Sequence, residues 1–413
     1  MARHRSIARA LRRAGLLGSL ALVPAAALGG GLKPITISRA DDTITEIHAR
    51  IAGDAIVWQR GLGAFSEIMR WNGGPSAENL SSNGVADENP ETDGVHIVWQ
   101  ETNGAEHDIA VHDLLTHTTT LLTSPGDEIT PLVSGIYLAW VEKVDADGEV
   151  FIDPGPPGLQ ITGNAFVESE FAVDGATLVW SEGDDLHLTA DAADDEHEIA
   201  LWNGDTQELF ILNTPEDDIH PSVANGILVW QAGADGSGSI WMSDTEGVAE
   251  PLYAGTDERD PKTDGTRVVW EHWDGEDLDL YLVHLATPNV ITSLTSDTGK
   301  DDVTPQIQGD DIVWVKKAKP GDSEIWVSWR GGAPTVLPWT HDNGRDDVEP
   351  RLDGDRFVYE SCVNLGQPTE LCDVVLVAPE PRATLLAAAA LAVLAGLANR
   401  SARRATDPQR DAR

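Results

Sequence analysis

The chain has 413 residues, of which 69 are acidic and 28 are basic, so its formal net charge at pH 7 is −41. Such a field repels phosphate backbones and anionic lipid headgroups, which argues against nucleic-acid binding and against electrostatic docking on a membrane. Because this length exceeds one ordinary domain, internal repeats have to be considered before any other fold.

The chain begins with a segment typical of a secretory signal peptide. Five arginines are followed by an apolar run from Ala14 to Ala27, which ends in three small residues. The pair Arg12-Arg13 leaves twin-arginine export open beside general secretion. We therefore expect residues 1–28 to be removed and the rest to be exported to the cell surface or the extracellular space, with a periplasmic or membrane-anchored intermediate.

A repeat of 40 to 50 residues follows the signal segment. Each repeat contains a buried-type aromatic residue, and five residues before it stands a glycine or, once, an asparagine. The aromatic positions, predicted to pack the blades, are Trp58, Trp99, Trp140, Trp180, Trp230, Trp270, Trp314 and Tyr359. The predicted turn positions are Gly53, Gly94, Gly135, Gly175, Asn225, Gly265, Gly309 and Gly354.

The turn residue and the aromatic residue together predict a β-hairpin in every repeat. Asp-Gly between apolar runs, as at Asp93-Gly94, is a strong signal for a tight turn. Asn225 fits the same position, because Asn is the residue that best replaces Gly where φ is positive. In Ile97-Val98-Trp99 consecutive apolar residues indicate a strand buried on both faces. Two more strands after a polar loop give four per repeat, which is typical of a propeller blade.

These features predict an all-β fold, a β-propeller of about eight four-stranded blades over residues 34–377. The last repeat lacks its fourth strand, and Pro34–Ile37 has the pattern of the strand that is missing. An N-terminal strand would therefore close the last blade and remove the open edges of the ring. This closure favours eight blades, with seven as the alternative.

The repeat resembles those of TolB-like or PD40-type propellers, in which each blade carries an acidic loop, a proline, an Asp-Gly turn and an apolar-aromatic strand. Asp301–Pro305 and Asp346–Pro350 show this motif most clearly. The resemblance implies periplasmic or surface proteins that often bind other macromolecules. It implies no single activity, because propellers host many functions.

Two cysteines and an acidic insertion are candidate sites. Cys362 and Cys372 flank a predicted hairpin in the last repeat, and in an exported protein they are expected to form a disulfide. Asp145, Asp147 and Glu149 lie close together in a loop, which makes Ca²⁺ the candidate cofactor. Acidic pairs also recur before the blades, at Asp217-Asp218, Asp257-Glu258, Asp301-Asp302 and Asp346-Asp347. They either bind Ca²⁺ as well or only cap backbone N–H groups in turns.

The C-terminal residues form a third region. Pro379-Glu380-Pro381 precedes an apolar stretch from Ala383 to Ala398 and then a cluster of arginines. This order resembles the PEP-CTERM sorting signal, which implies that residues 379–404 are recognised by an exosortase-type processing enzyme, with 405–413 as a short polar tail. The alternative is a simple C-terminal membrane anchor. In both cases the membrane contacts the protein only through this segment.

No catalytic residue can be assigned from the sequence, because neither a His-Glu-x-x-His nor a Gly-x-Ser-x-Gly motif occurs. The sequence therefore predicts a non-catalytic, monomeric, exported cell-surface propeller that binds extracellular polymer or protein partners. One alternative is a propeller enzyme that acts on polysaccharide as a lyase or hydrolase. The other is a periplasmic, TolB-like envelope scaffold.

Overall fold

The computed structural model describes residues 32–379, with gaps at 39–42, 125, 144–147, 154–157, 165, 184–196, 213, 215, 245–246, 256 and 368–369. The predicted signal peptide (1–28), all but the first residue of the predicted sorting segment (379–404) and the polar tail (405–413) lie outside the described residues. Within the described ranges, no helix has both the length and the apolar character needed to span a membrane.

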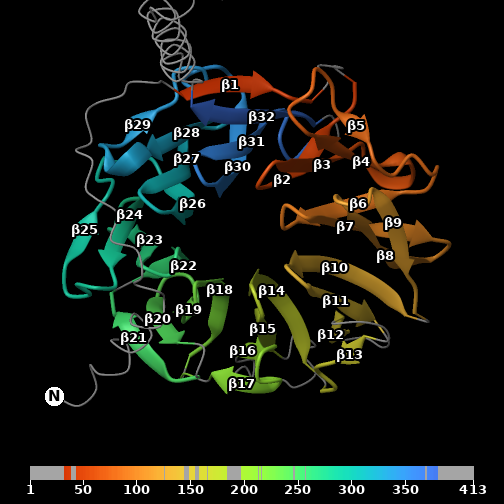
Figure 1. Cartoon of the computed structure of the whole chain (residues 1–413). Helices are drawn as coiled ribbons and strands as arrows, with labels where there is room; N and C mark the ends of the chain where they lie inside the picture. Colours follow the sequence, from red (N-terminus) through yellow and green to blue (C-terminus); the bar gives the residue numbers. More distant parts are fainter. Residues whose placement is uncertain are drawn as a thin grey trace, which may run out of the picture.

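Eight antiparallel sheets of four strands each stand in a ring, and the first strand of each sheet lies nearest the centre (Figure 1). This arrangement confirms the predicted β-propeller and gives eight blades, not seven. Consecutive buried positions, as in β3, occur because neighbouring sheets cover both faces of each blade.

The blades follow one another in chain order. The first is β2 (Glu46–Ala52), β3 (Ala55–Arg60), β4 (Glu67–Trp71) and β5 (Glu78–Asn79), and the second is β6 (Asp87–Thr92), β7 (His96–Asn103), β8 (Glu106–Asp113) and β9 (Thr118–Leu122). The third is β10 (Asp127–Ser134), β11 (Tyr137–Lys143), β12 (Glu149–Asp153) and β13 (Leu159–Gln160), and the fourth is β14 (Val167–Asp174), β15 (Thr177–Gly183), β16 (Glu198–Asn203) and β17 (Glu208–Leu212).

The second half of the ring repeats the pattern. The fifth blade is β18 (Asp218–Ala224), β19 (Ile227–Ala232), β20 (Ser239–Asp244) and β21 (Ala249–Tyr253), and the sixth is β22 (Glu258–Thr263), β23 (Arg267–Trp273), β24 (Leu278–His284) and β25 (Ile291–Ser293). The seventh is β26 (Asp302–Gln308), β27 (Asp311–Lys319), β28 (Asp322–Ser328) and β29 (Thr335–Val336), and the eighth is β30 (Asp346–Asp353), β31 (Arg356–Val363), β32 (Leu371–Pro379) and β1 (Leu32–Thr36).

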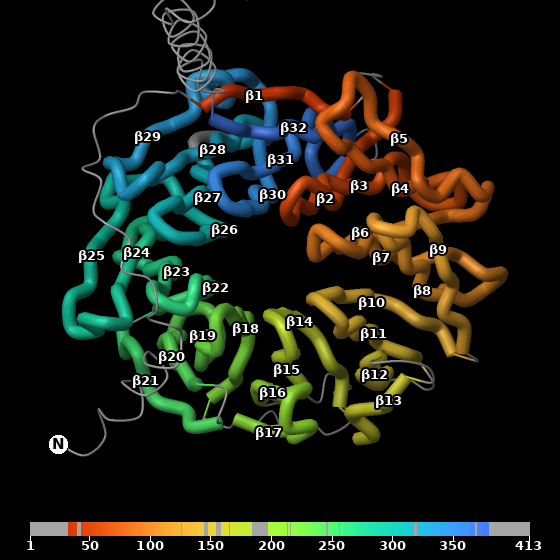
Figure 2. Tube along the Cα trace, in the orientation of Figure 1, coloured from red at the N-terminus to blue at the C-terminus, as the bar shows by residue number. Residues whose placement is uncertain are grey.

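The N-terminal strand closes the ring. β1 pairs antiparallel with β32, from Leu32 opposite Pro379 to Thr36 opposite Val375, and Figure 2 shows the two ends of the colour scale side by side there. The backbone N–H of Ile37 adds a bond of 3.1 Å to the carbonyl of Val374. The predicted closure of the last blade is therefore confirmed, and this sheet has four strands like the other seven.

The repeat aromatics form the core between blades. Trp58 is completely buried and belongs to a cluster with Val358 and Val374 of the eighth blade. The other seven repeat aromatics are also buried, with Trp140 the most accessible at 7%. Each aromatic thus joins its own sheet to a neighbouring one, which is why the repeat requires a large apolar side chain at this position.

The turn between the first two strands of each blade needs a left-handed backbone. All eight predicted turn residues have positive φ, including Asn225 at 50°. At Gly94 a Cβ atom would lie 3.0 Å from the carbonyl oxygen of Ala52 in the preceding blade, so a larger residue would clash as well as strain the turn.

Candidate functional site: the central channel

A cavity of about 650 Å³ lies at the centre of the ring, and residues of all eight first strands or the turns after them line it. Its wall mixes apolar side chains such as Phe171 and Val223 with polar ones such as Thr92 and Gln306. Concave sites of this size with both kinds of lining are typical places for ligands to bind. The channel is therefore the candidate functional site.

Every first strand has a β-bulge at the same point, ten residues before the repeat aromatic. The residue at the bulge has positive φ in all eight blades, although none is glycine. These residues are His48, Asn89, Thr130, Glu170, His220, Asp260, Thr304 and Glu349. A left-handed backbone costs a non-glycine residue about 1 kcal/mol. Because this conformation recurs in all eight blades, we infer that the bulge has a structural role.

The bulge exposes backbone N–H groups that bond to the preceding blade. The N–H of Asn89 donates to Gln59 Oε1 at 3.2 Å, and the N–H of Thr304 donates to Glu271 Oε1 at 2.7 Å. In both cases the acceptor is the residue that follows the repeat aromatic. The bulges thus connect neighbouring blades around the channel and fix its width.

Two arginines line the channel where the eighth blade meets the first. Arg50 Nε lies 2.5 Å from Glu91 Oε1, and Arg351 Nη2 lies 2.8 Å from Glu349 Oε2. Burial acts to lower the pKa of Arg50, but Glu91 and further carboxylates outweigh it and raise that pKa. Burial and then the charge of Arg50 lower the pKa of Arg351. The two arginines and their glutamate partners thus form a cluster of ion pairs at the channel.

A further ion pair joins the fourth and fifth blades. His220 Nε2 lies 3.0 Å from Glu170 Oε1, and the bond to Glu170 is the main reason why the pKa of His220 is raised to about 9. Burial would raise the pKa of Glu170, but the contacts with His220 outweigh it and lower that pKa. At neutral pH the imidazole is therefore charged.

The predicted turn residues surround one mouth of the channel. The N–H of Gly53 donates to Asp353 Oδ2 at 2.8 Å, and the N–H of Asn225 donates to Asp174 Oδ2 at 2.5 Å. The aspartate of one Asp-Gly turn therefore caps the turn of the next blade. Asp174 and Asn225 also contribute directly to the cavity lining.

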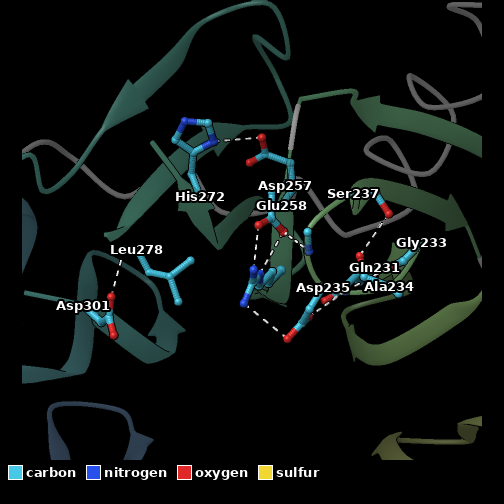
Figure 3. Close-up of polar contacts among 12 residues, drawn as sticks. Gln231, Gly233, Ala234, Asp235, Ser237, Asp257, Glu258, His272, Leu278 and Asp301 are labelled. Atoms are coloured by element: carbon cyan, nitrogen blue, oxygen red, sulfur yellow. Dashed lines mark hydrogen bonds and ion pairs between the residues drawn. The ribbon is translucent and has the colours of Figure 1, made fainter. Parts of the chain in front are cut away.

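The acidic pairs before the blades divide into two roles, and the first residue of each pair is a cap. Asp257 Oδ1 accepts the backbone N–H of Gly236 at 2.8 Å, and Asp301 Oδ1 accepts that of Leu278 at 3.2 Å. Figure 3 shows Asp301 directed at Leu278 of the preceding blade. These carboxylates therefore bind backbone groups at or just before a third strand, which is how an acidic side chain commonly serves a turn.

The second residue of each pair is buried, twelve residues before the repeat aromatic. Trp230 Nε1 donates to Asp218 Oδ1 at 2.8 Å, and burial raises the pKa of Asp218 to about 7. In the sixth blade Glu258 Oε1 also lies 2.8 Å from His272 Nδ1 (Figure 3). A buried acidic residue stands at this offset in all eight blades, although in three of them the residue before it is not acidic: Glu46, Asp87, Glu128, Glu168, Asp218, Glu258, Asp302 and Asp347. The sequence suggests Ca²⁺ binding or turn caps for four of these residues and does not predict their burial.

The remaining predicted site residues lie away from the channel. Cys362 and Cys372 are opposite each other on β31 and β32, with their Cα atoms 4.0 Å apart, and form a disulfide. Glu149 begins β12 and is buried, with 4% of its surface exposed. The other two calcium candidates, Asp145 and Asp147, lie outside the described residues.

Comparison with known proteins gives a likeness in fold. No family model and no curated protein sequence matches the chain. A solved structure from a study of two prolyl endopeptidases matches with a TM-score of 0.54 and 8% identity, over 79% of this chain and 55% of that one. The β-propeller domain of the Trilobed protease from Pyrococcus furiosus, described as having an open velcro topology, matches with a TM-score of 0.50 and 10% identity, over 71% of this chain and 97% of that one.

The chain is similar in its β-propeller fold to these solved structures. An acylaminoacyl peptidase from Pyrococcus horikoshii also matches, with a TM-score of 0.48 and 12% identity, over 78% of this chain and 58% of that one. The chain thus spans little more than half the length of these two larger peptidases. Only their propeller domains match.

These comparisons correct the function predicted from the sequence. That prediction was a non-catalytic surface propeller for extracellular polymer or protein partners, with a polysaccharide-acting enzyme and a TolB-like scaffold as alternatives. The solved propellers that this chain resembles come from peptidases, so the prediction is wrong. Its error has a physical reason, because the repeat motif specifies how a blade is built and carries no information on what the channel accepts.

Proposed function

We propose that this chain is a peptidase-type propeller whose central channel admits and holds extended peptide segments, as the peptide-handling part of a proteolytic system. The observation that carries the proposal is the cavity of about 650 Å³ that all eight blades line. The likeness to the propellers of prolyl endopeptidases and of the Trilobed protease supports it.

The chemistry of the channel wall suits a peptide. An extended peptide presents backbone carbonyls and amides together with apolar side chains. Arg50 and Arg351 can donate to carbonyl or carboxylate oxygens, Glu91 can accept from amides, and Phe171 offers an apolar contact. The net charge of −41 attracts cationic peptides over a longer range.

The proposal can be tested with a labelled, unstructured peptide that contains proline and lysine. Fluorescence anisotropy would compare the wild type with Gln306→Trp, which adds bulk to the channel lining. The control is Glu208→Trp on the exposed strand β17, which places the same side chain outside the channel. We expect Gln306→Trp to weaken binding at least about tenfold, or ~1.4 kcal/mol, and the control to leave it unchanged. Equal affinities in both variants, or no binding by the wild type, would contradict the proposal.

We further propose that the propeller works outside the cytoplasm as a monomer. Three features support export: the signal-type segment 1–28, the PEP-CTERM-type segment 379–404 with an exosortase-type enzyme as its processing partner, and the disulfide between Cys362 and Cys372. The motif at Asp301–Pro305 supports a PD40-type repeat. Mass spectrometry of the mature protein tests export, since processing removes both terminal segments. An intact N-terminus on the mature protein would contradict it.

A further inference from the structure

The junction between the sixth and seventh blades holds a buried cation. Lys316 has only 2% of its surface exposed, and its Nζ lies 2.8 Å from Asp302 Oδ2 and also contacts Asp297. Asp279 of the sixth blade completes a cluster whose carboxylate oxygens lie within 4.8 Å of one another. Thr295 donates its hydroxyl to Asp279 at 3.0 Å. At this junction a lysine ammonium balances buried carboxylates.

The junction between the third and fourth blades has the same framework, with a glutamate at the position of the lysine. Glu149 stands at the same offset from its repeat aromatic as Asp279 on β24. Glu168 likewise corresponds to Asp302 on β26. The hydroxyl of Thr162 donates to Glu149 at 2.8 Å, just as the hydroxyl of Thr295 donates to Asp279. Glu182 takes the place of Lys316 and lies opposite Glu168 across β14 and β15. A positive charge is thus replaced by a negative one.

The glutamates of this junction are buried, and Glu168 lacks a hydrogen-bond partner among the described residues. Glu149, Glu168 and Glu182 expose 4%, 7% and 6% of their surfaces. Within the part of the chain that the structure describes, neither carboxylate oxygen of Glu168 accepts a hydrogen bond, since the hydroxyl proton of Thr162 goes to Glu149. Burial, with the charges of Glu149 and Glu182, raises the pKa of Glu168 to about 8. An unpaired buried carboxylate is costly, so the junction favours a cationic ligand.

We propose that a divalent, oxygen-seeking cation, represented by calcium, binds between the third and fourth blades on Glu149, Glu168 and Glu182, in the place that Lys316 fills between the sixth and seventh. Carboxylate and hydroxyl oxygens are the ligands that calcium prefers. The carboxylates of these three glutamates are not all within 4.8 Å of one another, unlike those of Asp279, Asp297 and Asp302. Side-chain rotations would therefore have to bring them together around a bound ion.

The junction between the second and third blades also carries acidic residues, but their carboxylates accept more hydrogen bonds. There Glu128 accepts the backbone N–H of Ser124 at 2.7 Å, and Asp108 accepts Asn103 Nδ2 at 2.9 Å. Glu128 Oε2 has no partner within the described ranges, but Glu128 keeps a bond to its other oxygen, whereas both oxygens of Glu168 lack one. The proposal is therefore confined to the junction of the third and fourth blades.

The test introduces a lysine into the junction of the third and fourth blades, at the position equivalent to Lys316. Calcium chloride is titrated into the chelator-treated full chain by calorimetry, and thermal unfolding is followed with calcium, with magnesium and with sodium chloride at equal ionic strength. We expect the wild type to bind calcium and to melt several degrees higher in its presence. Glu182→Lys should lose one equivalent of bound calcium and should melt above the wild type when a chelator is present. Asp279→Asn, in the lysine-filled junction, should bind calcium like the wild type.

A second variant provides the test if Glu182→Lys does not fold. Glu168→Gln preserves the size of the side chain and should weaken calcium binding by at least about tenfold. The proposal is overturned if the wild type binds no calcium or if sodium chloride gives the same rise in melting temperature. It is also overturned if both variants bind calcium as the wild type does, because the ion would then lie elsewhere, for instance in the loop at 144–148.

Discussion

In four blades the indole nitrogen of the repeat tryptophan bonds to the acidic residue that stands twelve positions before it, whereas Trp180 donates to Glu182 instead. A fully buried indole N–H needs an acceptor, and in the second and seventh blades Trp99 and Trp314 donate to Asp87 and Asp302 at 2.8 and 2.6 Å. The carboxylate loses its hydration in return, and for Asp87 burial raises the pKa to about 6. At the residue scale the blade is therefore held by a strong bond that includes an unfavourably buried charge.

Replacing Asp218 with alanine should test this bond. The change removes the acceptor of Trp230 Nε1 and of both the backbone N–H and the hydroxyl of Thr214. Because buried donors without partners cost about 1–3 kcal/mol each, we expect a loss of roughly 3 kcal/mol in the free energy of unfolding, measured in urea. The neighbouring Asp217→Ala removes a cap of 3.2 Å on the backbone N–H of His197 and a partly exposed ion pair of 3.9 Å with its ring, and should cost less than about 1 kcal/mol. Equal losses in the two variants would contradict this account.

At the scale of elements, the closing strand β1 is held by more than its backbone bonds. Ile37, just after β1, is 6% exposed and packs in a cluster with Trp58 and Val358 from the first and eighth blades. Ile37→Ala should therefore lower the free energy of unfolding by about 2–4 kcal/mol, as measured by chemical denaturation. Ile35 lies within β1 but is 45% exposed, so Ile35→Ala is the matched control and should have a small effect. A large loss from the control instead would mean that strand pairing dominates.

The disulfide stabilises the hairpin to which β1 adds. Cys362 and Cys372 are ten residues apart in sequence and join β31 to β32. Closing a loop of this length in the unfolded chain is worth about 2–3 kcal/mol, so Cys362→Ser with Cys372→Ser should lose that amount. Unfolding in urea with and without a reductant checks this expectation. The wild type under reducing conditions should match the double variant, and a wild type that is insensitive to the reductant would contradict it.

The blade pattern could be predicted from the sequence because it consists of side-chain types at fixed offsets. Trp99 with Gly94, and Pro34–Ile37 as the missing strand, are local patterns of that kind. The bulge could not be predicted, because its residues are as different as Thr130 and Glu170, and contacts with other blades help to hold the backbone there. The burial of Asp218 depends on the pairing of β18 with β19, and the channel exists only once eight blades are assembled.

At the scale of the whole molecule, the ring of buried carboxylates should make the folded protein more stable, and not less, as the pH falls toward about 5. Burial is the largest cause of a pKa raised to about 7 for Glu46, about 8 for Glu168 and about 7 for Asp347. Between the ordinary carboxyl pKa near ~4 and these values, the folded state binds more protons than the unfolded state. The free energy of unfolding should therefore fall as pH rises from about 5 to 8.

His220 acts in the same direction at higher pH. Its pKa is raised to about 9 by Glu170, so the stability from this pair is present below the unfolded value and is lost as pH rises through about 9. Urea unfolding at several pH values, in the presence of a chelator and at constant ionic strength, measures the slope. Increasing stability from pH 5 to 8 would contradict the assignment of the buried carboxylates.

Closure by β1 also sets the order in which the protein can reach its final shape. The register joins Leu32 to Pro379, so the first strand to leave the ribosome has its partner in the last blade to be made. Contacts of such long sequence separation form slowly, because the entropy of closing the loop is lost before the contact stabilises the chain. Until then the blades form an open arc whose last sheet lacks its fourth strand, and this incomplete sheet is the form most exposed to misassembly with other chains.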